Sequence, residues 1–158
     1  MAFKKWTASA AQLRPDPKFN NKLASKFINC MMWDGKKSVA ERIFYQAVER
    51  LGEKVKDIPP IEVFETAVTN VKPNIQIRSR RVGGSNYQVP MAVNNKRKQS
   101  LAIRWILEST RSKKGRPMNE RLAAELLDAY NRQGAAMGKR EEVHRQAEAN
   151  KAFAHFAW

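Results

Sequence analysis

Three arginines recur at a fixed interval in the second half of the chain. Arg97, Arg104 and Arg111 are seven residues apart, and seven residues drift by only about 20° around an ideal α-helix. On a helix, the three guanidinium groups would therefore share one face. A guanidinium stays ionised, and its planar fork matches the paired oxygens of a phosphate. The spacing predicts a row of phosphate-binding groups, and we favour this over a merely solvated helix face because acidic residues are almost absent nearby.

A second group of cations lies beside a pair of glycines. Arg78, Arg80 and Arg81 precede Gly83 and Gly84 in the sequence. Glycine permits a tight turn, and it also lets the backbone approach a nucleic-acid strand closely. The two interpretations are compatible, since a narrow tip is itself a useful probe. The nearby aromatic residue at position 87 offers a surface on which a base can stack.

The excess of positive charge is concentrated in one part of the chain. Thirty Lys and Arg oppose 15 Asp and Glu, which gives a net charge of +15. Residues 72–116 carry +11 with a single acid, and the other 113 residues carry only +4. Such a focused polycation indicates a polyanionic partner, with nucleic acid first. A membrane surface is less favoured because the cations lie on different elements. The basic residues of this segment are Lys72, Arg78, Arg80, Arg81, Lys96, Arg97, Lys98, Arg104, Arg111, Lys113, Lys114 and Arg116.

Residues suited to catalysis are scarce. His144 and His155 fit neither a metal-binding nor a triad spacing, and the paired carboxylates stand next to basic residues. We therefore expect no catalytic residue, no metal and no cofactor. An RNA-processing enzyme is the alternative, and loss of turnover on substitution of either histidine would support it. Cys30 has no partner for an internal disulfide, and its apolar neighbours predict a small buried residue.

Apolar residues at helical spacing predict six helices. They cover about 20–33, 39–51, 60–72, a fourth that starts between 95 and 100, 117–133 and 135–150. Gly52 is the expected C-cap of the second helix. The fourth is the most apolar and should lie centrally. No segment approaches the roughly 20 apolar residues that span a bilayer, and the N-terminus lacks the apolar run of a signal peptide, so we expect a cytoplasmic protein.

The periodicity changes from helical to alternating between the third and fourth helices. Ile75 and Ile77 fall on one side and Gln76 on the other, which predicts a β-hairpin over 74–90. A lone hairpin should project from an all-α, single-domain body of about six helices. We expect a basic N-terminal arm at 1–18, with Lys4 and Lys5, that a partner must order. The helical domain would span 19–150 and a C-terminal tail 151–158.

Several longer motifs point to one family. They are 13–19 (LRPDPKF), 34–38 (DGKKS), 78–84 (RSRRVGG), 87–90 (YQVP), 104–105 (RW), 139–145 (KREEVHR) and 147–155 (AEANKAFAH). Through them the chain resembles bacterial-type members of the small-subunit ribosomal protein S-seven family over residues 13–158. The resemblance implies six helices with a hairpin between the third and fourth. It also implies a non-catalytic protein that binds the 3′ major domain of 16S-type rRNA and nucleates assembly of the subunit head.

The resemblance also implies partners and binding residues. Its partners would be small-subunit rRNA, exit-site tRNA and mRNA, and neighbouring head and platform ribosomal proteins, without a membrane or a homo-oligomer. The tail would meet the platform protein and rRNA. An architectural DNA-binding protein is the remaining alternative, but its β-arms end in an intercalating wedge that a glycine pair cannot supply. The family's rRNA-binding surface falls on Lys36, Lys37, Arg78, Arg80, Arg81, Arg97, Arg104 and Arg111, and its region near exit-site tRNA and mRNA on Val82, Gly83, Gly84 and Tyr87.

Overall fold

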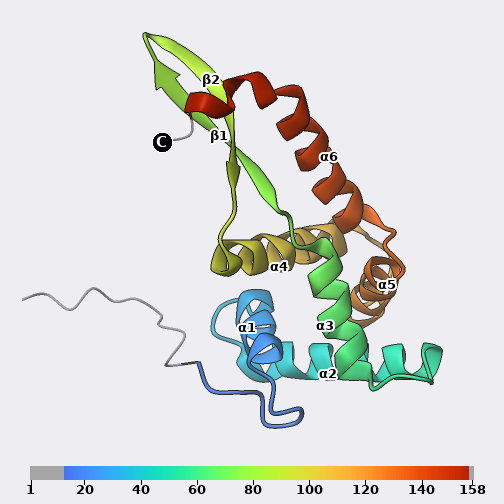
Figure 1. Cartoon of the computed structure of the whole chain (residues 1–158). Helices are drawn as coiled ribbons and strands as arrows, with labels where there is room; N and C mark the ends of the chain where they lie inside the picture. The colour runs from blue at the N-terminus through green and yellow to red at the C-terminus, as the bar shows by residue number, and fades with distance from the viewer. Residues whose placement is uncertain (1–12, 157–158) are drawn as a thin grey trace, which may run out of the picture.

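A stack of helices forms the base of the structure, and a long hairpin rises from it (Figure 1). The computed structural model describes residues 13–156. In chain order the elements are α1 (Lys22–Met31), α2 (Lys37–Lys54), α3 (Pro60–Val71), β1 (Ile75–Val82), β2 (Ser85–Ala92), α4 (Asn95–Ser112), α5 (Met118–Tyr130), α6 (Ala135–Ala149) and the 3-10 helix η1 (Lys151–Phe156). Within the described residues, the predicted fold of six α-helices and one hairpin between α3 and α4 is confirmed. The short helix η1 was not predicted.

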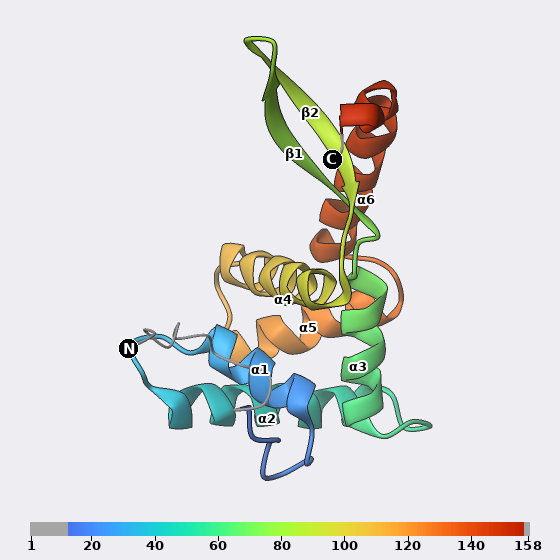
Figure 2. The ribbon, with the colours of Figure 1, turned by 60° about the vertical axis from the view of Figure 1, so that its left-hand side comes forward.

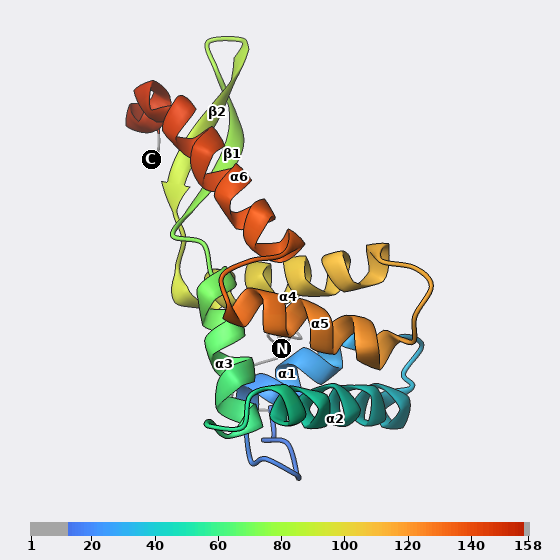
Figure 3. The same ribbon diagram turned by 90° about the vertical axis from the view of Figure 1, so that its right-hand side faces the viewer.

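The core lies where the apolar faces of α1 to α5 meet. Phe27 of α1, Phe44 of α2 and Phe64 of α3 are fully buried, and their ring centroids lie 5.1 to 5.7 Å apart. Helices α4 and α5 cover this cluster from above, and α2 lies at the bottom of the stack (Figure 3). Ile103 and Ile106 of α4 are almost completely buried. Helix α4 also contacts α6, so it lies between the rest of the helical stack and the C-terminal helices.

The hairpin is closed by a two-residue turn. Strands β1 and β2 pair antiparallel in a register that places Val82 opposite Ser85. Gly83 and Gly84 between them have φ of 58° and 90°, which is the left-handed backbone that such turns require. The second strand continues to Ala92, two residues past the predicted limit, with Pro90 inside it. Proline is tolerated there because a two-stranded sheet has only edge strands, so its missing N–H leaves no inner ladder incomplete.

The hairpin joins the helical body through short connections. Only Val93 and Asn94 separate the end of β2 from the start of α4. Val93 is buried, and the side chain of Asn94 accepts a hydrogen bond of 2.9 Å from the backbone N–H of Arg97. This bond satisfies one of the free donors at the helix N-terminus. Strand and helix therefore follow one another without an intervening flexible loop.

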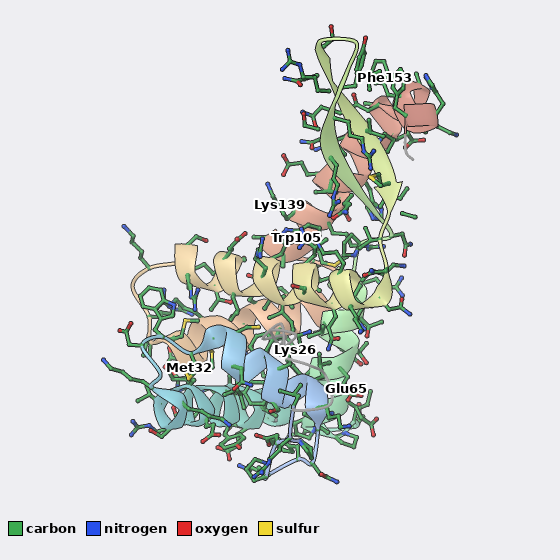
Figure 4. The ribbon with its side chains drawn as sticks, turned by 90° about the vertical axis from the view of Figure 1, so that its left-hand side faces the viewer. Lys26, Met32, Glu65, Trp105, Lys139 and Phe153 are labelled. Carbon is green, nitrogen blue, oxygen red and sulfur yellow. The ribbon has the colours of Figure 1, made fainter. Side chains whose placement is uncertain are left out.

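Helix α6 and η1 support the hairpin. They rise from the same side of the body as the hairpin and reach it near the top (Figure 2). Trp105 is buried on the side of α4 that lies near the start of α6 (Figure 4). At the upper end, the ring of Tyr87 on β2 packs against Phe153 and Phe156 of η1 at 5.2 and 5.1 Å. The projecting hairpin thus has a helical support over much of its length.

Two sequence predictions about single residues are wrong. Gly52 does not cap α2, because the helix continues to Lys54 and Val55 follows as its C-cap. Instead, a Cβ atom at position 52 would lie 2.7 Å from Cγ of Pro60, so this glycine permits close packing of α3. Cys30 is exposed instead of buried, because it lies off the buried stripe of α1. Partial burial still raises the pKa of its thiol, against the opposing charges of Lys26 and Arg104.

The segment before α1 is fixed by a buried aspartate. Asp16 accepts hydrogen bonds of 3.1 Å from the backbone N–H groups of Lys18 and Phe19, and one of 2.7 Å from the hydroxyl of Tyr45 on α2. Burial, together with this hydrogen bond and the charge of Asp16, raises the pKa of Tyr45 above its usual value. Residues 13–21 are thereby attached to the body. The predicted arm residues Lys4 and Lys5 lie outside the described residues.

Candidate nucleic-acid interface

Helix α4 presents its three regularly spaced arginines to solvent. Arg97, Arg104 and Arg111 are all exposed, and 14 residues of helix separate the first from the last by about 21 Å. None of the ion pairs among residues 13–156 involves them. We call these three residues the α4 rail. Its charges are not neutralised by carboxylates in this part of the chain, so they remain available to a polyanion.

The α4 rail connects the hairpin to the opposite end of the body. At one end, Nε of Arg97 donates a hydrogen bond of 3.4 Å to Oε1 of Gln76 on β1. At the other end, Nη2 of Arg111 donates a bond of 3.1 Å to the carbonyl oxygen of Met31, the last residue of α1. The arginines therefore occupy one side of α4 and join the base of β1 to the α1–α2 connection. A partner that follows the rail would touch all three elements.

Asn74 is the junction between the hairpin and the helices. Its backbone N–H donates to Nε2 of His144 on α6 at 3.2 Å, and its carbonyl accepts from the N–H of Val93 at 3.0 Å. Its side-chain oxygen accepts a bond of 2.8 Å from Nζ of Lys98 on α4. Burial, with a smaller contribution from the charge of Arg140, lowers the pKa of His144 and so favours the neutral ring that can accept this bond. Helices α4 and α6 and the connection between β2 and α4 thus fix the base of β1.

The hairpin arginines divide between two faces of the sheet. Successive side chains on a strand alternate, so Arg81 lies on the face opposite to Arg78 and Arg80. Arg78 and Arg81 are exposed, whereas Arg80 is half-buried and lies directly opposite Tyr87. The tail packs on the ring of Tyr87, so this ring has protein neighbours in the position where we expected a base. The residues that best present charge near the tip are therefore Arg78 and Arg81.

The other predicted cations differ in their availability. Most are exposed, but Lys37 forms an ion pair of 3.7 Å with Glu41, and Lys98 is held by Asn74. Lys113 makes ion pairs with the buried carboxylate of Glu125 at 2.6 Å and with Asp128 at 3.7 Å. These two ion pairs of Lys113 could not be predicted from sequence, because they depend on how α5 packs beside the end of α4. The exposed candidates are Lys36, Lys37, Lys96, Lys114 and Arg116.

The ion pair with Glu125 gives Lys113 a structural role. Its carboxylate is 0% exposed, and Oε1 accepts a hydrogen bond of 2.9 Å from the backbone N–H of Ala136 in the first turn of α6. Oε2 faces the ammonium group of Lys113. One buried acid therefore joins the α4–α5 loop to the beginning of α6. Lys113 is correspondingly less suited to bind phosphate than its exposed neighbours.

The described part of the chain contains neither a metal site nor a membrane-spanning helix. In residues 13–156, no three side chains of the His, Cys, Asp or Glu type come together as a metal site would require. None of the helices in the same range has the length and apolar character needed to cross a bilayer. The strongest chemical feature of the described surface is thus the cationic face along α4 and the hairpin.

A helical body with a basic hairpin and an arginine row belongs to the class of nucleic-acid-binding proteins. The family profile described as "Ribosomal protein S7p/S5e" matches residues 3–151. A relative named "Small ribosomal subunit protein uS7" from Rhodopirellula baltica is 60% identical over 153 residues, which cover 96% of this chain and 98% of the relative. Proteins of the same name from Thermosipho africanus and Natranaerobius thermophilus are 55% and 53% identical, over 96% and 98% of this chain and 97% and 99% of theirs. The chain belongs to the ribosomal protein S7p/S5e family.

This membership confirms the broad prediction from sequence. The protein is a ribosomal protein with a structural role and no catalytic activity, and rRNA is its partner class. The relatives named above are bacterial, and a bacterial-type protein of this family is a component of the cytoplasmic ribosome. The absence of an evident catalytic arrangement in the sequence agrees with this family.

Proposed function

We propose that this protein binds the 3′ major domain of small-subunit rRNA and nucleates assembly of the subunit head. The α4 rail and the exposed arginines of the hairpin, Arg78 and Arg81, would hold a folded RNA junction between them. A-form RNA presents its phosphates and 2′-hydroxyls in a shape that proteins recognise with little reading of base sequence. Arginine is suited to this task because its fork binds phosphate oxygens in pairs.

One observation carries the proposal. The α4 rail is held at both ends, by Gln76 of the hairpin and by the carbonyl of Met31, and no carboxylate of residues 13–156 pairs with it. A scattered excess of charge would only keep the protein soluble, whereas a fixed row of exposed cations provides a surface for a polyphosphate backbone. The lysines at the start of α2, Lys36 and Lys37, extend this surface beyond the end of the rail.

The hairpin tip and the tail would serve further partners. We propose that Val82, Gly83 and Gly84, at the far end of the hairpin, lie beside exit-site tRNA and mRNA. The resemblance of this tip to the family motif supports the assignment, and so does its position far from α4 (Figure 1). The tail, which packs on β2 through Phe153 and Phe156, would present its outer side to a neighbouring platform protein. A groove of about 500 Å³ between the hairpin base and the C-terminal helices adjoins it.

A charge-matched pair of variants tests the rRNA assignment. Arg97→Ala, Arg104→Ala and Arg111→Ala together should weaken binding to a 3′ major-domain rRNA fragment at least 100-fold, because three phosphate contacts of roughly 1 to 2 kcal/mol each are lost. The control combines Lys54→Ala, Lys56→Ala and Arg132→Asn, which removes three exposed charges on other parts of the body. Asn tolerates the left-handed backbone of Arg132, whose φ is 58°.

Filter binding or calorimetry at fixed salt compares the two triple variants. Circular dichroism establishes that both are folded. If the α4 variant folds and binds the fragment as tightly as the control does, the proposed interface is wrong. A hairpin shortened by Val82 and Ser85, which face each other across the strands, keeps the glycine turn and tests the tip separately. It should leave rRNA binding intact and reduce the retention of deacylated tRNA on reconstituted subunits.

A further inference from the structure

An exposed tryptophan stands at the end of α1, next to an apolar groove. Trp33 is the second residue after α1 and has 66% of its surface exposed, which is the largest exposure among the large apolar side chains in residues 13–156. The groove beside it has a volume of about 390 Å³. Its floor is apolar, with Met32, Val39 and Met118, and Met32 lies between the end of α1 and the start of α2 (Figure 4). The exposed indole and the apolar side chains of the groove form one contiguous patch, and such patches are typical of binding surfaces.

The indole ring of Trp33 is contacted by Arg111. The guanidinium carbon of Arg111 lies 4.9 Å from the centre of its ring, and the same guanidinium is fixed by its bond to the carbonyl of Met31. Cation and ring attract each other in this arrangement. The large exposed fraction of Trp33 leaves ring surface for a second flat group. The contact therefore holds the indole in place without covering it.

The charge around the groove selects the kind of occupant. Lys36, Arg111 and Arg121 line it together with the apolar residues, and none of its lining residues is acidic. A flat, apolar ring surface bordered by cations is the arrangement on which unpaired nucleic-acid bases stack while their phosphates meet the positive groups. The apolar side chain of a protein partner would use the floor of the groove, but it would leave the cations without counter-charge.

We propose that the groove beside Trp33 holds an unpaired RNA base stacked on the indole, with the adjoining phosphates at Lys36 and Arg111. The inference rests on the proposed function, because Arg111 is the last residue of the α4 rail and the RNA that follows the rail arrives at this groove. It adds a contact of a different kind. The rail binds phosphates, whereas Trp33 distinguishes a single-stranded nucleotide from a paired one.

Three substitutions at one position separate stacking from simple apolar burial. Trp33→Ala removes the ring, Trp33→Leu keeps an apolar side chain, and Trp33→Phe keeps a smaller ring. The probe is the 3′ major-domain rRNA fragment. Loss of one base-stacking contact should weaken binding between about 5-fold and 100-fold for Ala and Leu, and much less for Phe. The dependence of affinity on salt should stay at the wild-type slope, because no charge is removed.

A second measurement identifies the contact directly. Zero-length ultraviolet cross-linking of the wild-type protein to the fragment, followed by mass spectrometry, should give an adduct on the peptide that contains Trp33. Wild-type affinity in both Trp33→Ala and Trp33→Leu, with no such adduct, would overturn the inference while leaving the proposed function standing. Failure of the wild-type protein itself to bind would instead overturn the proposed function. Variants that bind RNA normally but fail to enter reconstituted subunits would assign the groove to a protein neighbour and overturn the inference.

Discussion

The backbone N–H of Asn74 donates a hydrogen bond of 3.2 Å to Nε2 of His144, although 70 residues separate the two along the chain. The bond joins the first residue before β1 to the middle of α6. It requires a neutral imidazole, because a protonated ring has no acceptor. The orientation of the hairpin relative to the helices therefore depends in part on one titratable side chain.

Stability should fall at mildly acidic pH through His144. Burial lowers the pKa of His144 from its ordinary value of 6.5, with a smaller effect of Arg140. The unfolded chain then binds a proton more readily than the folded one, so the contribution of the neutral ring is complete above pH 6.5 and is lost as pH falls toward the lowered pKa. NMR titration of the imidazole should give a midpoint below 6.5.

Glutamine at this position provides the control. His144→Gln can accept the same hydrogen bond but does not titrate, so its free energy of unfolding should vary less between neutral and mildly acidic pH than that of the wild type. His155→Gln changes the other histidine, which is exposed on η1, and should keep the wild-type profile. Identical profiles for the wild type and His144→Gln would contradict this account. Besides Arg140, the charged groups around His144 are Lys98, which shares Asn74, and Glu148 and Lys151, which line the same groove.

Arg104, in the middle of the α4 rail, should contribute one phosphate contact to RNA binding. Arg104 is exposed and makes no ion pair within residues 13–156. Arg104→Gln should keep the fold and reduce the slope of log affinity against log salt by about 0.7 to 0.9 for the rRNA fragment. Lys56→Gln removes one exposed charge beyond α2 and should leave the slope unchanged. Binding measured across a series of KCl concentrations checks both, and equal slopes would remove Arg104 from the interface.

Glu125 should be among the most sensitive polar positions for stability. Glu125→Ala leaves the N–H of Ala136 and the ammonium of Lys113 without their partner, and it opens a space in the core. We expect a loss of about 3 kcal/mol in the free energy of unfolding. Glu120→Ala breaks the half-exposed pair with Arg50 at 2.9 Å and should cost at most about 1 kcal/mol. Urea denaturation of both variants measures the difference, and equal losses would refute the role given to Glu125.

Two helical glycines should respond to alanine in opposite directions. Gly138 lies within α6 with nothing near its missing Cβ, so Gly138→Ala should stabilise the protein by about 0.5 to 1 kcal/mol through helix propensity. Gly52→Ala gains the same propensity but places a Cβ atom 2.7 Å from Cγ of Pro60, and we expect a net loss of about 1 to 2 kcal/mol. Thermal unfolding of the pair isolates the packing effect. A stabilised Gly52→Ala would show that α3 yields at this contact.

The elements could be predicted from sequence because their signals are local. Apolar spacing fixed the six helices, the change to alternation placed the hairpin, and a heptad interval put Arg97, Arg104 and Arg111 on one exposed face. These patterns depend on residues a few positions apart. The longer motifs in the chain indicated a family of ribosomal proteins, and the matching family profile and the relatives confirm this prediction.

What the sequence did not reveal depends on tertiary contacts. The sequence does not distinguish Lys113 from its basic neighbours, because its ion pair with Glu125 forms only when α5 packs beside the end of α4. The sequence suggested that the ring of Tyr87 is available to a base, but the tail packs on this ring. It also suggested that Gly52 ends α2, whereas this glycine makes room for Pro60 of α3. In each case the contacting residue is distant along the chain or lies on another element, and a single sequence contains no signal for such a tertiary contact. The individual RNA-binding residues stay predictions for the same reason.

The two-residue connection of Val93 and Asn94 has a mechanical consequence. A linker this short, with one residue buried and the other capping α4, cannot absorb rotation of β2 relative to the helix. The hairpin and α4 therefore form one rigid unit. An RNA that binds both the hairpin and α4, as we propose, would therefore have to adopt the fixed angle between them.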